Sequence, residues 1–327
     1  MNQNQSKPLR RLPFPNWWPV LGGALFGVLL RLIFWGDPDT RFPLGAMHPA
    51  FIGFGPLAVG AITVYVAELS ARRSWGYYMV AGMLANCLFI AATMVIMIEG
   101  LICAILILPL FSVYGGLGGL LMGAICRGTN WPKKPAVYSF ALMPLLLGVL
   151  IPDGAGEPFL AVIERTLVVN AEAPVIWRQL LDTRGIQEAE LGQAWMYRIG
   201  VPMPISGVTR STPEGLVRDI RMGKGIHFSQ HSTQWKLNRY VRWTYRFDEN
   251  SFPPGALDDH VKIGGQYFDV IDTEYVLTPA GTHSTALTVR MHYRVSTQFN
   301  WYAKILASGL IGNFEEAILR FYKGRST

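Results

Sequence analysis

The side chains best suited to acid and base chemistry outside the apolar segments lie together in Asp258, Asp259 and His260, a segment flanked by proline and glycine. A carboxylate beside an imidazole can move a proton to or from a bound substrate. The same composition is typical of a solvated loop that could gate the mouth of a cavity, and we favour this second interpretation. We therefore assign no catalytic residue from the sequence.

Other reactive constellations are missing from the sequence. It contains no GxSxG, no HExxH and no glycine-rich phosphate loop, and its three cysteines fall within apolar segments. His227 and His231 lie on one side of a predicted strand, but residues four apart along a strand are separated by about 13 Å. One metal ion cannot bridge that distance, so we predict no metal site and no cofactor.

Alternation with a period of two places the apolar side chains of each predicted strand on one face of a sheet. We expect that face to bind a ligand, with the phenols of Tyr245 and Tyr293 orienting its polar group. The predicted ligand-binding residues are Phe228, Gln230, Trp243, Tyr245, Met291, Tyr293, Gly309, Gly312 and Phe314. The two glycines would leave space beside the final helix. A packed core without a ligand, with a close helix contact at the glycines, is the alternative.

The opposite face of the same strands is basic. Its cations are His227, His231, Arg242, Arg246, Arg290, His292 and Arg294. They could form a patch that faces anionic headgroups or a partner. Neutralisation by Asp269, Asp272 or Glu274 on the neighbouring strand is equally compatible with the sequence.

Seven strands and a long helix must position these side chains in an α+β domain over 159–324. The strands are predicted at 159–169, 205–211, 215–222, 226–235, 239–247, 264–277 and 284–297. A helix begins near Pro174, a second is expected within 182–193, and the last covers 300–323. Short links predict an antiparallel sheet around the last helix. The helix face expected to pack on the sheet is Ala303, Ala307, Leu310, Phe314, Ile318 and Phe321.

The first half of the sequence, 1–152, is predicted to be a transmembrane helical domain, because the chain is 50% hydrophobic and only 16% charged. Five spans are predicted, at about 17–36, 50–69, 77–98, 110–126 and 136–151. We expect Pro109 to separate an interfacial piece, 101–108, from the fourth span. Gly115, Gly119 and Gly123 suit close helix contact within the bundle, and Asn86 is a candidate for an interhelical hydrogen bond. For Arg31 and Glu99, snorkelling to the headgroups is favoured over a buried ion pair.

The loops between spans indicate an orientation. Eight Lys or Arg residues lie on one side, at 7–11, 72–73 and 127–134, whereas the other side holds only Arg41. Positive loops face the cytoplasm. The prediction is a multi-pass protein of a bacterial inner membrane, with a cytoplasmic N-terminus and a periplasmic or extracellular C-terminal domain. Because the excess cations lie between apolar runs, nucleic-acid binding is disfavoured.

The sequence from Phe159 to Lys323 resembles the START/polyketide-cyclase superfamily, SRPBCC, which has the helix-grip fold. The resemblance rests on VNAEAPVIW at 169–177, on Gly225, Phe228 and Trp235, and on Leu277, Pro279 and His283, where the family pattern has Thr in place of His283. It implies a domain that binds lipids, sterols, polyketides or hormones, and only some members are enzymes.

Three functions are therefore weighed. The first is a membrane-tethered, non-enzymatic protein whose external domain binds a hydrophobic small molecule or lipid. The second is a cyclase-like or aromatase-like enzyme in which Tyr245, Tyr293 or His260 polarises the carbonyl group of a hydrophobic substrate. The third is a structural or signalling partner of an envelope protein.

Overall fold

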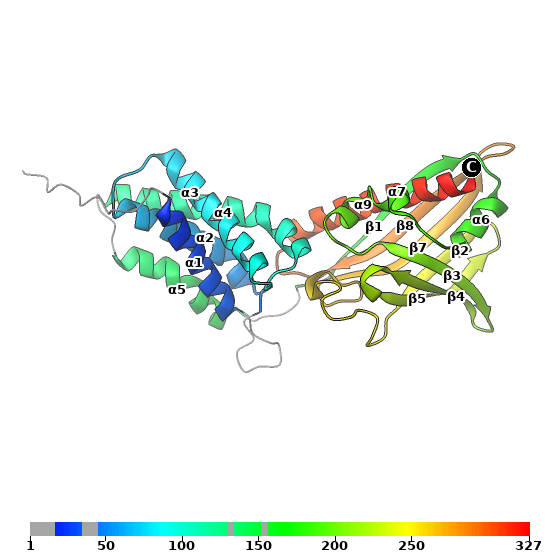
Figure 1. The fold of residues 1–327 in the computed structure, drawn as a ribbon, viewed down its shortest axis with the longest axis horizontal. Coiled ribbons are helices and arrows are strands. Elements are labelled where there is room, and N and C mark those ends of the chain that lie inside the picture. The colour runs from blue at the N-terminus through cyan, green and yellow to red at the C-terminus, as the bar shows by residue number, and fades with distance from the viewer. Residues whose placement is uncertain (1–16, 35–44, 130–133, 152–155) are drawn as a thin grey trace, which may run out of the picture. The chain divides into compact units, whose positions relative to one another are not determined.

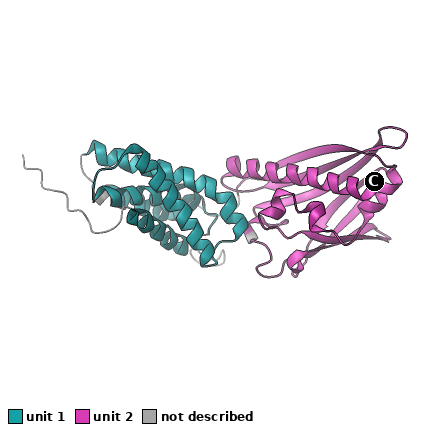
Figure 2. Cartoon of the chain, turned by 45° about the horizontal axis from the view of Figure 1, so that its top comes forward, with its two compact units in different colours: residues 1–154 teal, residues 155–327 magenta. Residues whose placement is uncertain are grey.

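The computed structural model describes residues 17–34, 45–129, 134–151 and 156–327. By its internal contacts the chain divides into two compact units, residues 1–154 and 155–327 (Figure 2). The first unit is helical and the second is built on a sheet. Each is described by itself below.

The helical unit contains α1 (Trp18–Ile33), α2 (Pro49–Glu68), α3 (Trp75–Val95), α4 (Leu101–Gly128) and α5 (Lys134–Leu150) (Figure 1). By length and composition, α2, α3 and α4 are long and apolar enough to cross a membrane, whereas α1 and 136–150 are shorter apolar helices. Three helices, rather than the five spans predicted, therefore meet this criterion. Residues 35–36 of the first predicted span, and the charges at 7–11, 37–41 and 133, lie outside the described residues.

Helix α4 is continuous through Pro109, so the predicted break between 101–108 and the fourth span is wrong. A proline inside a helix removes one backbone hydrogen bond, which the packing of a long helix can offset. Packing is close in the second half of α4. A Cβ at Gly115 would lie 2.6 Å from the carbonyl oxygen of Gly82, and one at Gly119 would lie 2.2 Å from that of Tyr78, both on α3. The glycines therefore permit the close contact within the bundle that their spacing predicts.

Two polar side chains of the helical unit bond to residues that are distant in the sequence. The Nε of Arg31 donates to Glu99 Oε1 at 2.6 Å, so an ion pair replaces the snorkelling that the sequence favoured. Asn86 on α3 donates to the carbonyl oxygen of Pro56 on α2 at 3.2 Å, which is the interhelical hydrogen bond considered above. Pairing of this kind is expected where apolar surroundings make an unsatisfied polar group costly.

The second unit is an antiparallel sheet with helices. Its elements in chain order are β1 (Phe159–Val169), α6 (Ala173–Leu181), β2 (Asp182–Thr183), α7 (Glu188–Leu191), α8 (Trp195–Arg198), β3 (Pro204–Thr212), β4 (Gly215–Met222), η1 (Gly223–Gly225), β5 (His227–Lys236), β6 (Tyr240–Arg246), η2 (Asp259–Val261), β7 (Phe268–Pro279), β8 (Thr285–Val295) and α9 (Asn300–Ser326).

The sheet has eight strands in the order β1-β8-β7-β6-β5-β4-β3-β2, not the seven predicted. The additional strand is β2, which pairs Asp182 with Val208 and Thr183 with Gly207 of β3. The short helix expected within 182–193 is present as the single-turn α7, and β2 occupies the start of that range. Two residues are too few to show the alternation by which a strand is detected.

Helix α9 packs on β1 and β8 and also contacts α6, α7 and α8. Figure 1 shows it running along one face of the curved sheet. Its buried residues Ile311, Glu315, Ile318 and Tyr322 recur at spacings of four, three and four, which places them on one helix face. Of the predicted face, Ile318 and Phe321 are buried, whereas Ala303, Ala307, Leu310 and Phe314 are half-buried. A curled antiparallel sheet around a long final helix fits the helix-grip fold.

Candidate functional site

A row of polar side chains crosses the middle of the sheet on the face that α9 covers. Arg218 of β4 pairs in register with Gln230 of β5, which pairs with Tyr245 of β6. On β4 the flanking residues of the same face are Leu216 and Ile220, both buried. The row therefore places a guanidinium, an amide and a phenol side by side within an otherwise apolar surface. We call Arg218, Gln230 and Tyr245 the polar row.

Arg218 is the charged member of the polar row and is only 7% exposed. Its terminal nitrogen donates to the phenolic oxygen of Tyr322 on α9 at 3.3 Å. Within the described residues, its Nε has no hydrogen-bond partner and no carboxylate forms an ion pair with it. An arginine side chain stays protonated in proteins, so a positive charge lies beneath α9 without a counter-ion.

Phenols surround this charge. Tyr322 packs edge-on against Tyr275 with ring centroids 5.8 Å apart, and the hydroxyl groups of Tyr245 and Thr273 are 2.7 Å apart. Burial raises the pKa of Tyr245 to about 12 and raises the pKa of Tyr275 well above its usual value. Both phenols are therefore neutral hydrogen-bond donors at neutral pH.

An aromatic cluster adjoins one end of the polar row. Phe228 lies two residues from Gln230 on β5, and its ring is 5.9 Å from that of Tyr245 and 5.4 Å from that of Phe247. Phe252 extends the cluster, 5.3 Å from Phe247. All four rings are only half-buried. Apolar surface thus remains within reach beside the buried guanidinium.

The predicted ligand-binding residues are distributed unevenly. Trp243, Met291 and Tyr293 are buried on the sheet face under α9, and the Tyr293 hydroxyl is 2.7 Å from that of Ser308, so α9 already satisfies this phenol. Gln230 and Tyr245 belong to the polar row. Phe314 is half-buried and packs edge-on against Tyr197, with ring centroids 6.2 Å apart.

The two glycines of α9 do not open the interior as predicted. Gly309 is exposed, on the same side of the helix as Ile305 and Glu316, which is not the side that packs on the sheet. Gly312 is buried against β1, where an added Cβ would lie 3.5 Å from Arg165 and 3.9 Å from Ile163. It therefore marks an ordinary helix contact with the edge of the sheet.

Several important residues were not predicted from the sequence. Arg218 is one, although its alternation with Leu216 and Ile220 indicates that it shares their face. Tyr275 and Tyr322 are further examples. Glu315 is another, and its position between Ile311 and Ile318 indicates the buried stripe of the helix. In each case the position of the residue in the repeat of its strand or helix indicated a buried side chain, whereas its polarity indicated an exposed one.

Glu315 is 0% exposed, and neither of its carboxylate oxygens has a hydrogen-bond partner among the described residues. Burial raises its pKa to about 8, against the opposing charge of Arg165 on β1. At neutral pH the group is mostly protonated. It does not contribute a counter-ion to the polar row.

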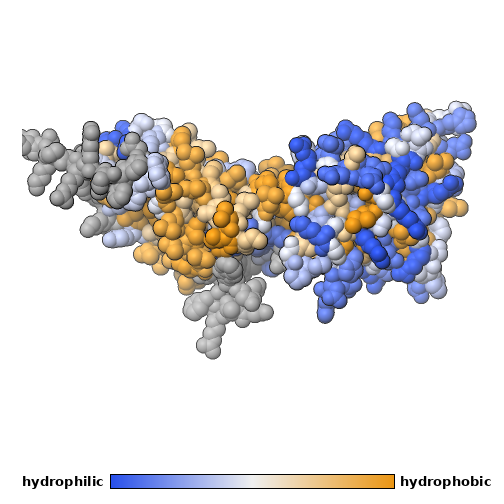
Figure 3. All heavy atoms as spheres, in the orientation of Figure 1, coloured by the Kyte–Doolittle hydropathy of each residue, from blue (hydrophilic) through white to orange (hydrophobic). Residues whose placement is uncertain are grey.

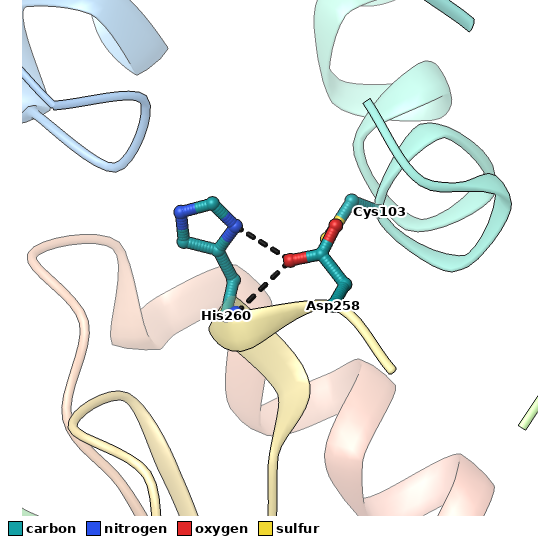
Figure 4. Close-up of side chains that lie close together, drawn as sticks. All are labelled: Cys103, Asp258 and His260. Atoms are coloured by element: carbon teal, nitrogen blue, oxygen red, sulfur yellow. Dashed lines mark hydrogen bonds and ion pairs between the residues drawn. The ribbon is translucent and has the colours of Figure 1, made fainter. Parts of the chain in front are cut away.

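Within the acid–base segment at 258–260, Asp258 forms hydrogen bonds with His260. Asp258 Oδ1 accepts from the backbone N–H of His260 at 3.0 Å and lies 2.7 Å from His260 Nδ1 (Figure 4). Asp258 is the cap of the short helix η2. Both bonds fix the turn.

Charges on the opposite face of the sheet form an alternating series, which we call the charge ladder. In register across β1, β8, β7 and β6 stand Glu164, Arg290, Glu274 and Arg242. Arg290 bonds Glu164 at 2.7 Å and Glu274 at 3.0 Å. Three of the seven cations of the predicted basic patch, Arg242, Arg290 and His292, therefore contact Asp272 or Glu274.

Asp272 completes the charge ladder and is 1% exposed. It accepts from Arg242 at 2.7 Å and lies 2.7 Å from Nδ1 of His292. Asp272, Glu274 and His292 are close enough together to hold a metal ion. Because the arginines already neutralise both carboxylates, we interpret this group as an ion-pair network rather than a metal site.

A groove of about 300 Å³ also opens on this outer side, between the β3–β4 turn and strands β5 and β6. Its lining includes Thr212, Glu214, His231, Arg242, Thr244 and Arg246. These residues do not belong to the polar row. The groove is therefore separate from the face on which a ligand was predicted.

Comparison with known proteins gives matches in solved structures only. No model of a known protein family matches the chain, and neither does any curated protein sequence. Among similar solved structures, the Zhui aromatase/cyclase from Streptomyces sp. R1128 is 12% identical, with a TM-score of 0.33 over 51% of this chain and 94% of that chain.

Two further neighbours have comparable scores. A truncated norcoclaurine synthase from Thalictrum flavum is 15% identical, with a TM-score of 0.29 over 52% of this chain and 95% of that chain. A START superfamily protein from Mycobacterium smegmatis is 15% identical, with a TM-score of 0.32 over 50% and 96%. These neighbours have the START/polyketide-cyclase fold at low identity. Likeness at this level does not transfer an activity.

Proposed function

We propose that the protein is a membrane-tethered binding protein whose C-terminal domain holds a hydrophobic small molecule or lipid. One observation carries the proposal: buried polar atoms without partners lie beside half-buried aromatic rings. Within the described residues these atoms include Arg218 Nε, Gln230 Oε1 and Trp243 Nε1. Each such atom costs about 1–3 kcal/mol if it stays unsatisfied, and native proteins keep few of them. A ligand with a polar group and an apolar body would satisfy both surfaces.

Membrane tethering is supported by the surface of the helical unit. Figure 3 shows apolar residues over much of its visible face. Large apolar side chains stand exposed there, for example Leu25 at 61%, Leu146 at 62% and Val95 at 82%. Such a surface is costly in water and suited to lipid.

The proposed location is a bacterial inner membrane, with the N-terminus in the cytoplasm and the C-terminal domain in the periplasm or outside the cell, as the loop charges indicate. Alkaline phosphatase fused after Thr327 should then be active. Activity of a cytoplasmic reporter at the same position would reverse the orientation.

Native mass spectrometry of the detergent-purified full chain tests the binding function. We expect an adduct that organic extraction releases as a hydrophobic compound. Phe228→Glu, which places a charge within the aromatic cluster, should abolish the adduct. The matched control, Thr244→Glu, changes an exposed residue on the outer face and should retain it. A wild-type protein that is free of adduct and takes up no added lipid would refute the proposal.

A cyclase-like enzyme acting on a hydrophobic carbonyl substrate is the second candidate, and Glu315 is the observation that favours it. A buried carboxyl group with a raised pKa is the kind of residue that serves as a general acid. Of the groups first considered, Tyr245 and Tyr293 each share a hydrogen bond with another hydroxyl group, that of Thr273 and that of Ser308, and His260 contacts Asp258. Recovery of a chemically altered compound after incubation would support the enzyme over the carrier.

A further inference from the structure

We propose that Arg218 binds an anionic group of the ligand, a carboxylate or a phosphate, so that the ligand class is an anionic amphiphile. This inference rests on the proposed binding function and specifies the chemistry of its ligand. Arg218 would bind the head of the ligand, and the aromatic cluster of Phe228, Phe247 and Phe252 would contact its apolar body.

The first argument is charge. A buried charge is costly unless it is paired and hydrogen-bonded. Elsewhere in the sheet the chain meets this requirement, since Arg242 pairs with Asp272 and Arg290 with Glu164 and Glu274. Arg218 is more deeply buried than either, yet within the described residues it has no acidic partner. Among the described residues, Arg218 is therefore a buried arginine of the sheet that no acid neutralises.

Neighbouring acids do not supply the counter-ion. Asp219 follows Arg218 in the strand, so its side chain points to the other face, where it lies 3.4 Å from Arg210. Glu315 precedes Tyr322 by seven residues on α9, and burial raises its pKa to about 8, so it is mostly uncharged at neutral pH. Tyr322 accepts a hydrogen bond from the guanidinium through its phenolic oxygen. An external anion remains the natural counter-ion.

The second argument is hydrogen bonding. A guanidinium has five N–H donors in a planar fork suited to carboxylate and phosphate oxygens. One terminal nitrogen contacts Tyr322, whereas Nε has no partner among the described residues. Tyr245 and Tyr275 lie near enough to interact electrostatically with the guanidinium. As neutral phenols they can donate to the same anion.

The third argument is the surface next to the charge. In the β4–β5 register Phe228 stands opposite Ile220, one same-face position along from Arg218 and Gln230. The half-buried rings of the aromatic cluster follow directly. A molecule whose anion reached Arg218 would therefore lay its adjoining carbon atoms on aromatic surface, which is the arrangement that an amphiphile requires.

The test compares three probes with the same alkyl chain: palmitate, hexadecyl phosphate and hexadecanol. Binding to the full-length protein in lipid nanodiscs at neutral pH is followed by tryptophan fluorescence. We expect the wild type to bind at least one of the two anions about tenfold more tightly than the alcohol, as a charge-assisted hydrogen bond predicts. Whichever anion binds more tightly identifies the headgroup as a carboxylate or a phosphate.

Three variants complete the design. Arg218→Met should abolish the preference for anions while hexadecanol still binds, and Arg218→Lys should retain part of the preference. Arg246→Met, on the outer face, should behave as the wild type. Equal binding of acid and alcohol by the wild type, or an unchanged preference in Arg218→Met, would overturn the inference and leave the proposed function standing. Failure of all three probes to bind the wild type would overturn both.

Discussion

Arginine side chains have different partners on the two faces of the sheet. On the outer face, Glu164, Arg290, Glu274 and Arg242 alternate in sign across four neighbouring strands, and each cation contacts a carboxylate. On the inner face, Arg218 is more deeply buried, and its hydrogen-bond partner among the described residues is the phenol of Tyr322. Among the described residues, the arginines of the charge ladder are therefore neutralised by acids, whereas the buried Arg218 is not.

The paired and the unpaired arginines affect the free energy of folding in opposite directions. Paired charges that share a buried carboxylate contribute to folding, because removing one partner strands the other. An unpaired buried guanidinium opposes folding, and a chain retains such a group when it has another role. The pairs of the outer face therefore contribute to stability, whereas the unpaired guanidinium of the inner face supports the proposed binding of an anion.

The same substitution on each face should give the largest contrast. Arg242→Met leaves the buried carboxylate of Asp272 with His292 alone. Because the Arg242 side chain is 37% exposed, the expected loss is about 2 kcal/mol, below that for a fully buried pair. In this unit that loss would lower the unfolding temperature by roughly 4–8 °C. The measurement is thermal unfolding of the purified full chain.

Arg218→Met is the control in that experiment and should unfold at the wild-type temperature or above it. Replacing a buried charge by an apolar side chain of similar length is often neutral or stabilising. If Arg218→Met destabilised the protein as much as Arg242→Met, the guanidinium would have an internal partner and the contrast between the faces would disappear.

Glu315 provides a second test, because its stability contribution depends on pH. Its pKa is raised by burial from 4.5 to about 8 in the folded protein. The folded state therefore binds the proton more tightly, and stability falls as the pH rises from about 4.5 to about 8. Glu315→Gln should remove this decline and stabilise the protein at the upper end by a few kcal/mol, because one pKa unit corresponds to about 1.4 kcal/mol.

Thermal unfolding at a series of pH values distinguishes the two proteins. Glu316→Gln is the matched control, since Glu316 is exposed and forms an ion pair with Arg320 on the same helix. It should leave the pH dependence of the wild type unchanged. A Glu315→Gln protein with the wild-type slope would show that Glu315 does not cause the decline.

Much of the architecture could be predicted because periodicity reports burial directly. The strands over 159–169 and 215–222 agree with β1 and β4, and the long final helix agrees with α9 to within three residues. Elements without a period were missed, as with the two-residue β2. The break expected at Pro109 was wrong because the local preference of one residue yields to the packing of a long helix.

The candidate site was harder to predict, because polarity and periodicity disagree at its key positions. The position of Arg218 in its strand places it on the inner face, whereas its charge is typical of the outer face. The arginines of β6 and β8 lie on the outer face, as charged residues usually do. Glu315 presents the same conflict on a helix. A buried partner such as Tyr322 lies 104 residues from Arg218 in the chain, and a strand pattern holds no information about so distant a contact.

The smallest expected effect concerns the outer end of the charge ladder. Glu164 on the edge strand β1 is 48% exposed and pairs with Arg290, which keeps its bond to Glu274 at 3.0 Å when Glu164 is changed. Glu164→Gln should therefore cost less than about 0.5 kcal/mol, because water screens the exposed charge and solvates the arginine that remains. Thermal unfolding at low and high salt would show a small difference that vanishes at high salt. A loss as large as that of Arg242→Met would mean that the charge ladder acts as one cooperative unit, whose stability does not depend on the burial of each pair.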